Sequence, residues 1–224
     1  MIATIATSRK YSKLLTHRRS GIDSVGDLAG KRVGTFIGTS AQYFLDLGLV
    51  SGGVDPSRVD LVPLQPSDAV QALATGRVDA IAVFEPFAFA TAKALEQDAR
   101  VLAGQTHPET WNIAASPGMR ERPESLEALC RAIERATLFI AREPARSRTI
   151  LRERLGMDEA AIDWVWRDIA YGITLRQSLI TGLEAQARWA LRYGHATGVP
   201  PNYLEYVHSE PLKRVRSGAA RIVE

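Results

Sequence analysis

The sequence predicts an α/β fold in which short apolar strands alternate with amphipathic helices. Between residues 32 and 103, segments of strand and helix character follow one another with short loops between them. The segment DAIAVF, which begins at Asp79, is almost entirely apolar, as is typical of a strand in a parallel sheet covered on both faces. From Pro123 onwards the pattern becomes almost wholly helical, which indicates a second part of different construction.

The individual elements follow from hydrophobic periodicity and from Gly, Pro and capping residues at their ends. The expected strands are 2–7, 13–17, 32–36, 59–63, 79–83, 100–103 and 110–116. The expected helices are 39–50, 66–75, 86–96, 123–142, 145–155, 158–170 and 178–193, with a short one around 202–207 and an extended link at 172–174. Short loops between strand, helix and strand predict right-handed βαβ units and a parallel sheet.

Composition excludes several function classes. The chain has 224 residues and a net charge of +3, without a lysine-rich run or aromatic–basic interleaving, so we expect no nucleic-acid partner. No apolar run approaches the roughly 20 residues that a membrane span needs. No signal peptide is visible in this chain, because Met1 is followed at once by the strand-like IATIA.

No constellation for catalysis or for a metal stands out. The single cysteine, Cys130, excludes an internal disulfide and lies among apolar residues at helical spacing, which favours a buried thiol over a nucleophile. There is no serine elbow, Walker loop, dinucleotide fingerprint or zinc-protease motif, and the four histidines lie in separate segments. We therefore expect no catalytic residues, no metal and no cofactor.

The strongest candidate for ligand binding is Gly38-Thr39-Ser40, between a strand and a helix. A helix start presents backbone N–H groups and partial positive charge, so it favours an anion. Gly38 allows close approach of a ligand, and the Thr39 and Ser40 hydroxyls bind the ligand or simply cap the helix. Strand ends at 65–68 and 84–87 are expected at the same edge of the sheet.

Further candidates each have a structural alternative. Glu85 is interpreted as a ligand contact, as a clasp between lobes, or as an exposed first-turn glutamate that complements a helix dipole. Trp111 stacks on a ligand or packs in the core, and Asn112 contacts a ligand or the backbone at a strand end. Arg9 and Tyr11 line a pocket rim or are solvated. The tryptophans at helical core spacing are interpreted as packing residues: Trp164, Trp166 and Trp189.

Several motifs occur in the order found in one known family. They are Gly21–Val33, the turn Gly38–Ser40, a helix end at Gly76–Ala80, and Phe84-Glu85-Pro86-Phe87. With these motifs the chain resembles the nitrate/sulfonate/taurine family of ABC-transporter substrate-binding proteins, most strongly over 20–103. The resemblance implies a periplasmic-binding-protein fold of type II, with two lobes and the ligand between them.

The resemblance also implies a division of the chain. Residues 20–103 correspond to a complete second lobe. Residues 1–19 correspond to a remnant of the first lobe with hinge strands, and 104–224 to the hinge return and the helical remainder of a partial first lobe. A βαβα stretch and a signal peptide are expected before residue 1. Without that stretch the C-terminal helices expose an apolar patch, which predicts either a homodimer through the incomplete lobe or poor solubility.

The function implied is capture of a small anionic organic solute, such as a sulfonate, nitrate, taurine or an aromatic acid, for an ABC permease. The full-length protein is then periplasmic or lipid-anchored outside the cell. Carried over from the family, the ligand contacts are Gly38, Thr39, Ser40, Glu85, Phe87, Trp111, Asn112, Ser8 and Arg9.

Two other classes stay open. One is an enzyme on the same fold, similar to a pyrimidine-precursor synthase or an aromatic sulfinate desulfinase. Cys130 in the middle of a helix argues against the desulfinase, and no cysteine-rich segment supports the synthase. The other is the effector-binding domain of a transcription regulator, although the sequence shows no helix-turn-helix.

Overall fold

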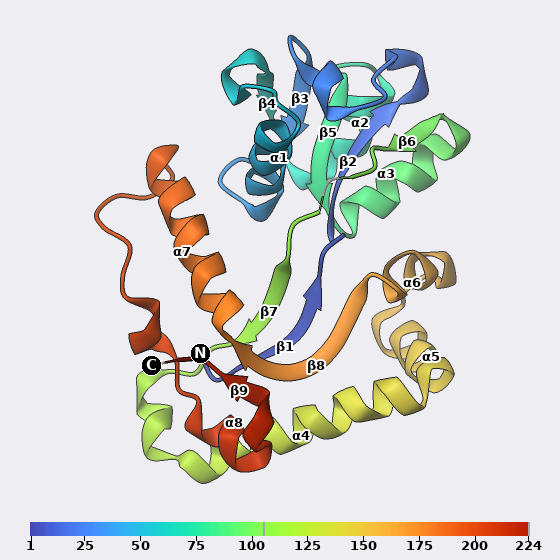
Figure 1. Cartoon of the computed structure of the whole chain (residues 1–224). Coiled ribbons are helices and arrows are strands. Elements are labelled where there is room, and N and C mark those ends of the chain that lie inside the picture. The colour runs from blue at the N-terminus through green and yellow to red at the C-terminus, as the bar shows by residue number, and fades with distance from the viewer. Residues whose placement is uncertain (105, 224) are drawn as a thin grey trace. The chain divides into compact units, whose positions relative to one another are not determined.

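The protein forms two compact units in a computed structural model that describes residues 1–104 and 106–223 (Figure 1). Unit 1 comprises Met1–Ser8, Glu109–Ile162 and Ile169–Glu224, and unit 2 comprises Arg9–Pro108 and Asp163–Asp168. Gln105, at the predicted boundary between 20–103 and 104–224, lies outside the described residues.

Unit 2 is a five-stranded sheet with helices on both faces. Its strands are β2 (Ser12–His17), β3 (Arg32–Thr35), β4 (Asp60–Pro63), β5 (Ala80–Phe84) and β6 (Ala99–Val101), and its longer helices are α1 (Ser40–Ser51), α2 (Ala69–Ala74) and α3 (Phe87–Leu95). Each of these elements lies within a few residues of its predicted position. The periodicity of the sequence therefore located them well.

The sheet of unit 2 is mixed, so the expectation of a parallel sheet is wrong for part of it. Its strand order is β4-β3-β5-β2-β6; β3 runs parallel to β4 and β5, whereas β2 is antiparallel to β5 and β6. The physical reason is that β2 enters the sheet from the opposite end, without a crossover helix before it. The three strands followed by the candidate binding turns are still mutually parallel.

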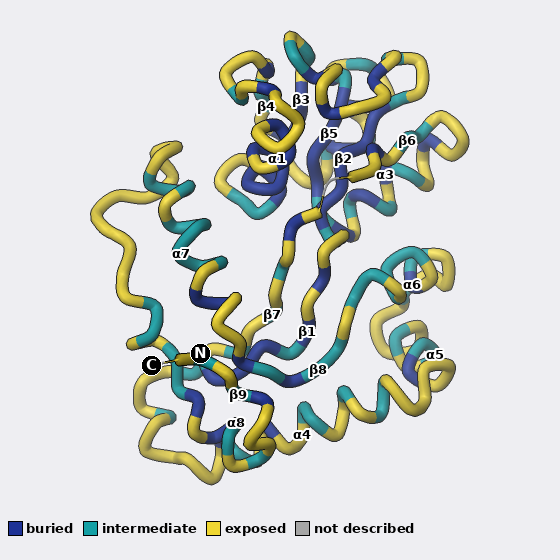
Figure 2. Tube along the Cα trace, in the orientation of Figure 1, coloured by how far each residue is buried: buried dark blue, intermediate teal, exposed yellow. Residues whose placement is uncertain are grey.

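Alternate residues of the central strands pack on opposite faces. Leu14 and Ala82 belong to the core cluster that includes Phe44 of α1, whereas Leu15 and Ile81 belong to the cluster that includes Leu73 of α2. All of β5 except Phe84 is buried (Figure 2). This double burial explains the nearly continuous apolar run that the sequence shows there.

Unit 1 is built on a four-stranded sheet of order β7-β1-β8-β9. Its strands are β1 (Ala3–Ser8), β7 (Glu109–Ile113), β8 (Ile169–Arg176) and β9 (Ala220–Arg221). Its helices are α4 (Pro123–Arg142), α5 (Pro144–Leu155), α7 (Gln177–Arg192) and α8 (Glu210–Val215), together with the first half of α6 (Glu159–Trp166). Leu126 and Cys130 of α4 pack on Ile173 and Leu175 of β8 in the core of this unit.

The prediction of a helix over 158–170 is wrong at its C-terminal end. The helix α6 stops at Trp166, and β8 occupies the region expected to be the end of a helix and a short link. The strand is a central one: it pairs with β1 on one side and with β9 on the other. Its β-branched residues Ile173 and Thr174 suit this position, and tertiary pairing outweighs the local helical pattern.

The unit boundaries differ from the ranges predicted from the sequence. Residues 9–19, expected in the first lobe, belong to unit 2 because β2 pairs with β5 and β6. Residues 163–168 also belong to unit 2, although the segments before and after them belong to unit 1. Among the described residues, no helix has the length and apolar character needed to cross a membrane.

Candidate ligand-binding site

The turn that leads β3 into α1 is shaped by Gly38 and capped by Thr39. Gly38 has a φ of 73°, in the left-handed region that favours glycine. The Thr39 hydroxyl donates to the carbonyl of Phe36 at 2.7 Å and accepts from the amide of Ala41 at 3.2 Å. The capping alternative for Thr39 is therefore realised in the structure.

Gln42 supplies a second internal contact of the same turn. Its buried side chain accepts a hydrogen bond from the Gly38 amide at 2.8 Å. The first amides of α1, including that of Ser40, have no acceptor within the helix itself. The positive end of the helix is thus at Ser40, which is half-buried.

Aromatic rings connect this turn to the end of β5. The ring of Phe36 meets those of Phe84 and Phe87 edge-on, at centroid distances of 5.2 and 5.4 Å. Tyr11 stacks on Phe84 at 6.0 Å. Because β3 and β5 are parallel neighbours, their carboxyl ends lie at one edge, and the predicted grouping of residues 38–40 with 84–87 holds within unit 2.

Glu85 is buried and engaged by three groups of unit 2. Its carboxylate accepts from the indole N–H of Trp164 at 2.5 Å and from the backbone amide of Phe89 at 3.0 Å. It also lies 3.3 Å from the ammonium of Lys13. These partners all belong to unit 2, so they do not form the expected clasp between lobes. The bond to the Phe89 amide in the first turn of α3 agrees with the helix-dipole alternative, but the expectation of an exposed Glu85 is wrong, because the residue is buried.

Lys13, Asp168 and Trp164 are functional candidates that sequence reasoning missed. The Lys13 ammonium lies 3.3 Å from the Asp168 carboxylate and 5.6 Å from the centre of the Trp164 ring. Lys13 is only 9% exposed, and its ammonium also donates to the carbonyl of Lys10. The sequence feature that could have indicated this cluster is Lys13 itself, which lies in the strand-like segment 13–17. A lysine in a buried strand requires an anionic partner.

A cavity of about 410 Å³ opens beside this cluster. Its polar lining includes Lys10, Lys13 and Asp168, and Phe44 and Trp164 contribute aromatic surface. All of its lining residues belong to unit 2. The volume lies in the range of cavities that bind small molecules.

His107 is a buried group of unit 2 without a hydrogen-bond partner for its Nε2 among the described residues. Its ring meets the ring of Tyr43 on α1 edge-on, at 4.9 Å. Burial lowers the pKa of His107, and the positive charge of Arg9 lowers it further. Both effects favour the neutral form of the imidazole.

The remaining predicted contacts lie outside this edge of the sheet. Ser8 is buried in β1, and Trp111 and Asn112 lie in β7, all in unit 1. The side-chain Oδ1 of Asn112 accepts from the Thr4 hydroxyl at 2.6 Å, and its side-chain Nδ2 donates to the Thr110 hydroxyl at 2.9 Å. Their ligand contacts, like that of the exposed Arg9, stay predictions.

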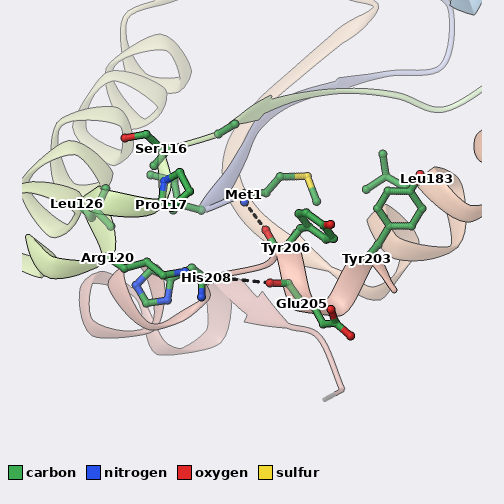
Figure 3. A pocket seen from close by; sticks show the side chains of 13 residues that line it. Met1, Ser116, Pro117, Arg120, Leu126, Leu183, Tyr203, Glu205, Tyr206 and His208 are labelled. Carbon is green, nitrogen blue, oxygen red and sulfur yellow. Dashed lines mark hydrogen bonds between the residues drawn. The ribbon is translucent and has the colours of Figure 1, made fainter. Parts of the chain in front are cut away.

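Unit 1 has its own cavity, of about 500 Å³ (Figure 3). Leu126, Leu183 and Tyr203 supply apolar surface, and Arg120 donates to the carbonyl of Glu205 at 3.2 Å. The amino group of Met1 donates to the carbonyl of Tyr206 at the same cavity. None of the predicted ligand contacts lines it.

The thiol of Cys130 is fully buried in α4, and burial raises its pKa. A buried thiol with a raised pKa is a poor nucleophile. Within residues 1–104 and 106–223, no group of three or more histidine, cysteine or acidic side chains is placed to hold a metal ion.

Comparison with known proteins assigns the family. Residues 1–147 match the family model described as "NMT1/THI5 like". The chain belongs to the NMT1/THI5-like family. Relatives of this NMT1/THI5-like chain in Brucella abortus and Brucella suis, named as candidate binding proteins, are 28% identical over 152 residues, or 65% of the chain. The match covers 47% of each relative, so the chain spans about half the length of the curated relatives it matches.

Solved structures confirm the predicted fold class. The alkanesulfonate-binding protein SsuA of Xanthomonas axonopodis pv. citri, bound to MOPS, matches with a TM-score of 0.71 and 20% identity, over 93% of this chain and 73% of that one. The periplasmic SsuA of Escherichia coli gives 0.74 and 20%, over 91% and 71%. The desulfurization enzyme DSZB gives 0.66 and 16%, over 97% and 79%. The NMT1/THI5-like chain therefore has the fold of periplasmic binding proteins, which enzymes also use.

Proposed function

We propose that this chain is part of the solute-binding component of an ABC import system and that it captures a small anionic organic solute. The full-length protein then works outside the cytoplasmic membrane, in the periplasm or on a lipid anchor, and delivers the solute to a membrane permease. The fold and the family support this proposal. Two proteins of the same fold are named as sulfonate-binding proteins.

One observation carries the assignment of the anionic group. The turn at Gly38 leads into the start of α1 at the edge where β3, β4 and β5 end, and this start is half-buried beside aromatic side chains. Partial shielding from water strengthens the attraction between a helix start and an anion. A sulfonate or carboxylate at Ser40 gains this attraction without a metal or an arginine clamp.

The enzyme alternative receives less support. A desulfinase on this fold needs an accessible nucleophile, and Cys130, the single cysteine of the chain, is buried in α4. Solute binding needs no reactive group.

The test is calorimetric titration of the protein with a panel of alkyl sulfonates, nitrate, bicarbonate and aromatic acids. We expect saturable one-to-one binding of at least one of these anions. Absence of binding to every anion in the panel contradicts the assignment of an anionic solute.

The substitution Ser40→Asp separates binding from folding. A carboxylate in the first turn of a helix stabilises the helix by about 0.3–1 kcal/mol, but it occupies and repels an anion site. We expect a melting temperature that is unchanged or higher, with anion affinity about tenfold weaker or worse. Ser178→Asp, in the first turn of α7, is the matched control and leaves the affinity unchanged.

A further inference from the structure

The cavity of about 410 Å³ in unit 2 combines charges of both signs with apolar walls. The ammonium of Lys13 is nearly enclosed and lies between two carboxylates, at 3.3 Å from Glu85 and 3.3 Å from Asp168. Lys10 adds a second ammonium, 3.7 Å from the other oxygen of Asp168. Two ammonium groups and two carboxylates balance, so the cluster has no net charge that would favour a simple anion or a simple cation.

The ion pair between Lys10 and Asp168 has the longest distance in the cluster. The Lys10 ammonium and the Asp168 carboxylate are separated by 3.7 Å, beyond the 2.7–2.9 Å of a tight charge-assisted hydrogen bond. The Lys10 side chain is 65% exposed, whereas that of Asp168 is 22% exposed and is also held by Lys13. The pair between Lys10 and Asp168 is therefore a weak contact, whereas Lys13 holds Asp168 at a shorter distance.

We propose that this cavity is a second small-molecule site and that it binds a small zwitterion carrying an ammonium and an acid group. The ligand's ammonium pairs with Asp168 in place of Lys10, and its acid group pairs with the displaced Lys10 ammonium. The ligand brings one positive and one negative charge, so the charge balance of the cluster is kept.

The apolar lining of the cavity favours a ligand whose two charged groups are joined by an apolar chain. Phe44 and Leu14 come from the core of unit 2, and Trp164 lies across the cluster with its N–H already bound to Glu85. A short methylene chain between the charged groups can pack against these side chains. Its burial is favourable, whereas a polar group there would lose its hydrogen bonds to water. The site is separate from the anion site proposed above, since none of Gly38, Thr39 and Ser40 lines this cavity.

The test uses the whole 224-residue chain and the ω-amino acids glycine, 3-aminopropanoate and 4-aminobutanoate as probes. Butanoate and butylammonium, each with one of the two charged groups, are the matched ligand controls. In the Ser40→Asp protein, whose α1 anion site is blocked, calorimetric titration should show one-to-one binding of at least one ω-amino acid, about tenfold or more tighter than either control ligand. Equal binding of butanoate, or no binding of any of the three at millimolar concentration, overturns the proposal.

Two variants locate the binding. Lys10→Met keeps the apolar part of an exposed side chain and removes its charge, so folding is preserved and affinity for the zwitterion falls about tenfold. Asp168→Asn should cause at least as large a loss. Asp60→Asn, an exposed carboxylate on β4 outside the cavity, should leave the affinity unchanged. Unchanged binding by the Lys10→Met protein overturns the proposal.

Ser40→Asp distinguishes this site from the anion site. It should weaken sulfonate or carboxylate binding at α1 and leave ω-amino-acid binding unaltered. A parallel loss of ω-amino-acid binding in the Ser40→Asp protein would assign the zwitterion to the α1 site and overturn the second site.

Discussion

At the scale of single residues, Lys13 joins the buried carboxylate of Glu85 to the half-buried carboxylate of Asp168. It lies between Glu85 and Asp168, and Glu85 in turn holds the indole of Trp164. Removing one member of such a cluster leaves a buried charge without a partner. Most of the destabilisation then comes from the remaining charge, which is buried without a partner, and less from the loss of the ion pair itself.

Lys13→Met should therefore destabilise the protein by about 2–4 kcal/mol. Glu85→Gln keeps an acceptor for the Trp164 N–H and should cost about 1–3 kcal/mol. The double variant should cost less than the sum of the two, because neither buried charge is then left alone. Urea unfolding at pH 7 measures all three values, and strict additivity would show that the 3.3 Å pair contributes no coupling.

His107 gives a pH dependence with a definite sign. Its pKa is lowered in the folded protein from 6.5, mainly by burial, so between the folded and unfolded pKa values the unfolded chain binds more protons. Stability should therefore fall as pH drops below about 6.5, with a slope of up to about 1.4 kcal/mol per pH unit from this residue.

His107→Gln should flatten the dependence of unfolding free energy on pH between about 7 and about 5. His208, whose pKa is also lowered, is the comparison, because burial of this residue is less complete. A His107→Gln protein with the same slope as the parent would assign the acid sensitivity to other groups.

At the scale of elements, the start of α1 depends on one hydroxyl. Thr39→Ala removes both the cap of the Ala41 amide and the bond to the Phe36 carbonyl. A loss of about 1 kcal/mol is expected, measured as a shift in the urea midpoint without a change in slope. Thr39→Ser should restore most of it, and failure of this rescue would point to the lost methyl group instead.

Much of the element pattern could be predicted, and the exceptions have identifiable causes. The helix α4 lies where its apolar spacing placed it, at 123–142, because its ends are marked by Pro123 and by Glu143-Pro144. The strand β8 was missed because WVWRDIAY carries helical spacing as well as strand-forming residues, and pairing with β1 and β9 decides between them.

Only the part of the candidate site formed by residues close in sequence could be predicted. The edge formed by residues 38–40 and 84–87 follows from short-range order, since each turn directly succeeds a parallel strand. The partners of Glu85 are distant in sequence: Lys13 lies far before it, on β2, and Trp164 follows it by 79 residues. Helical spacing suggested simple packing for Trp164, and only the fold reveals its hydrogen bond.

At the scale of the whole molecule, unit 1 exposes apolar side chains on α4 and α5. Leu129, Leu138, Ile150 and Leu155 are 40%, 42%, 42% and 67% exposed. Exposed large apolar side chains favour association, and the sequence led us to expect a homodimer. The homodimer stays a prediction.

Light scattering coupled to size exclusion should show an average mass that rises with protein concentration. Leu138→Gln with Leu155→Gln should shift the population toward the monomer, because it removes two of these exposed apolar side chains. Val50→Gln, at a 64% exposed position in unit 2, is the control and should leave the mass unchanged. A monomeric parent protein at all concentrations would contradict the prediction.

The segment 163–168 limits how this protein can be divided into modules. It returns to unit 2 after the long stretch Glu109–Ile162 in unit 1, and it carries Trp164 and Asp168, two of the partners that surround Lys13 and Glu85. A continuous fragment 9–108 therefore lacks part of its own polar core, and so does any fragment that ends with the family match at residue 147. A chimera that exchanges unit 2 with that of a relative must therefore include this short segment to keep Trp164 and Asp168 beside Lys13.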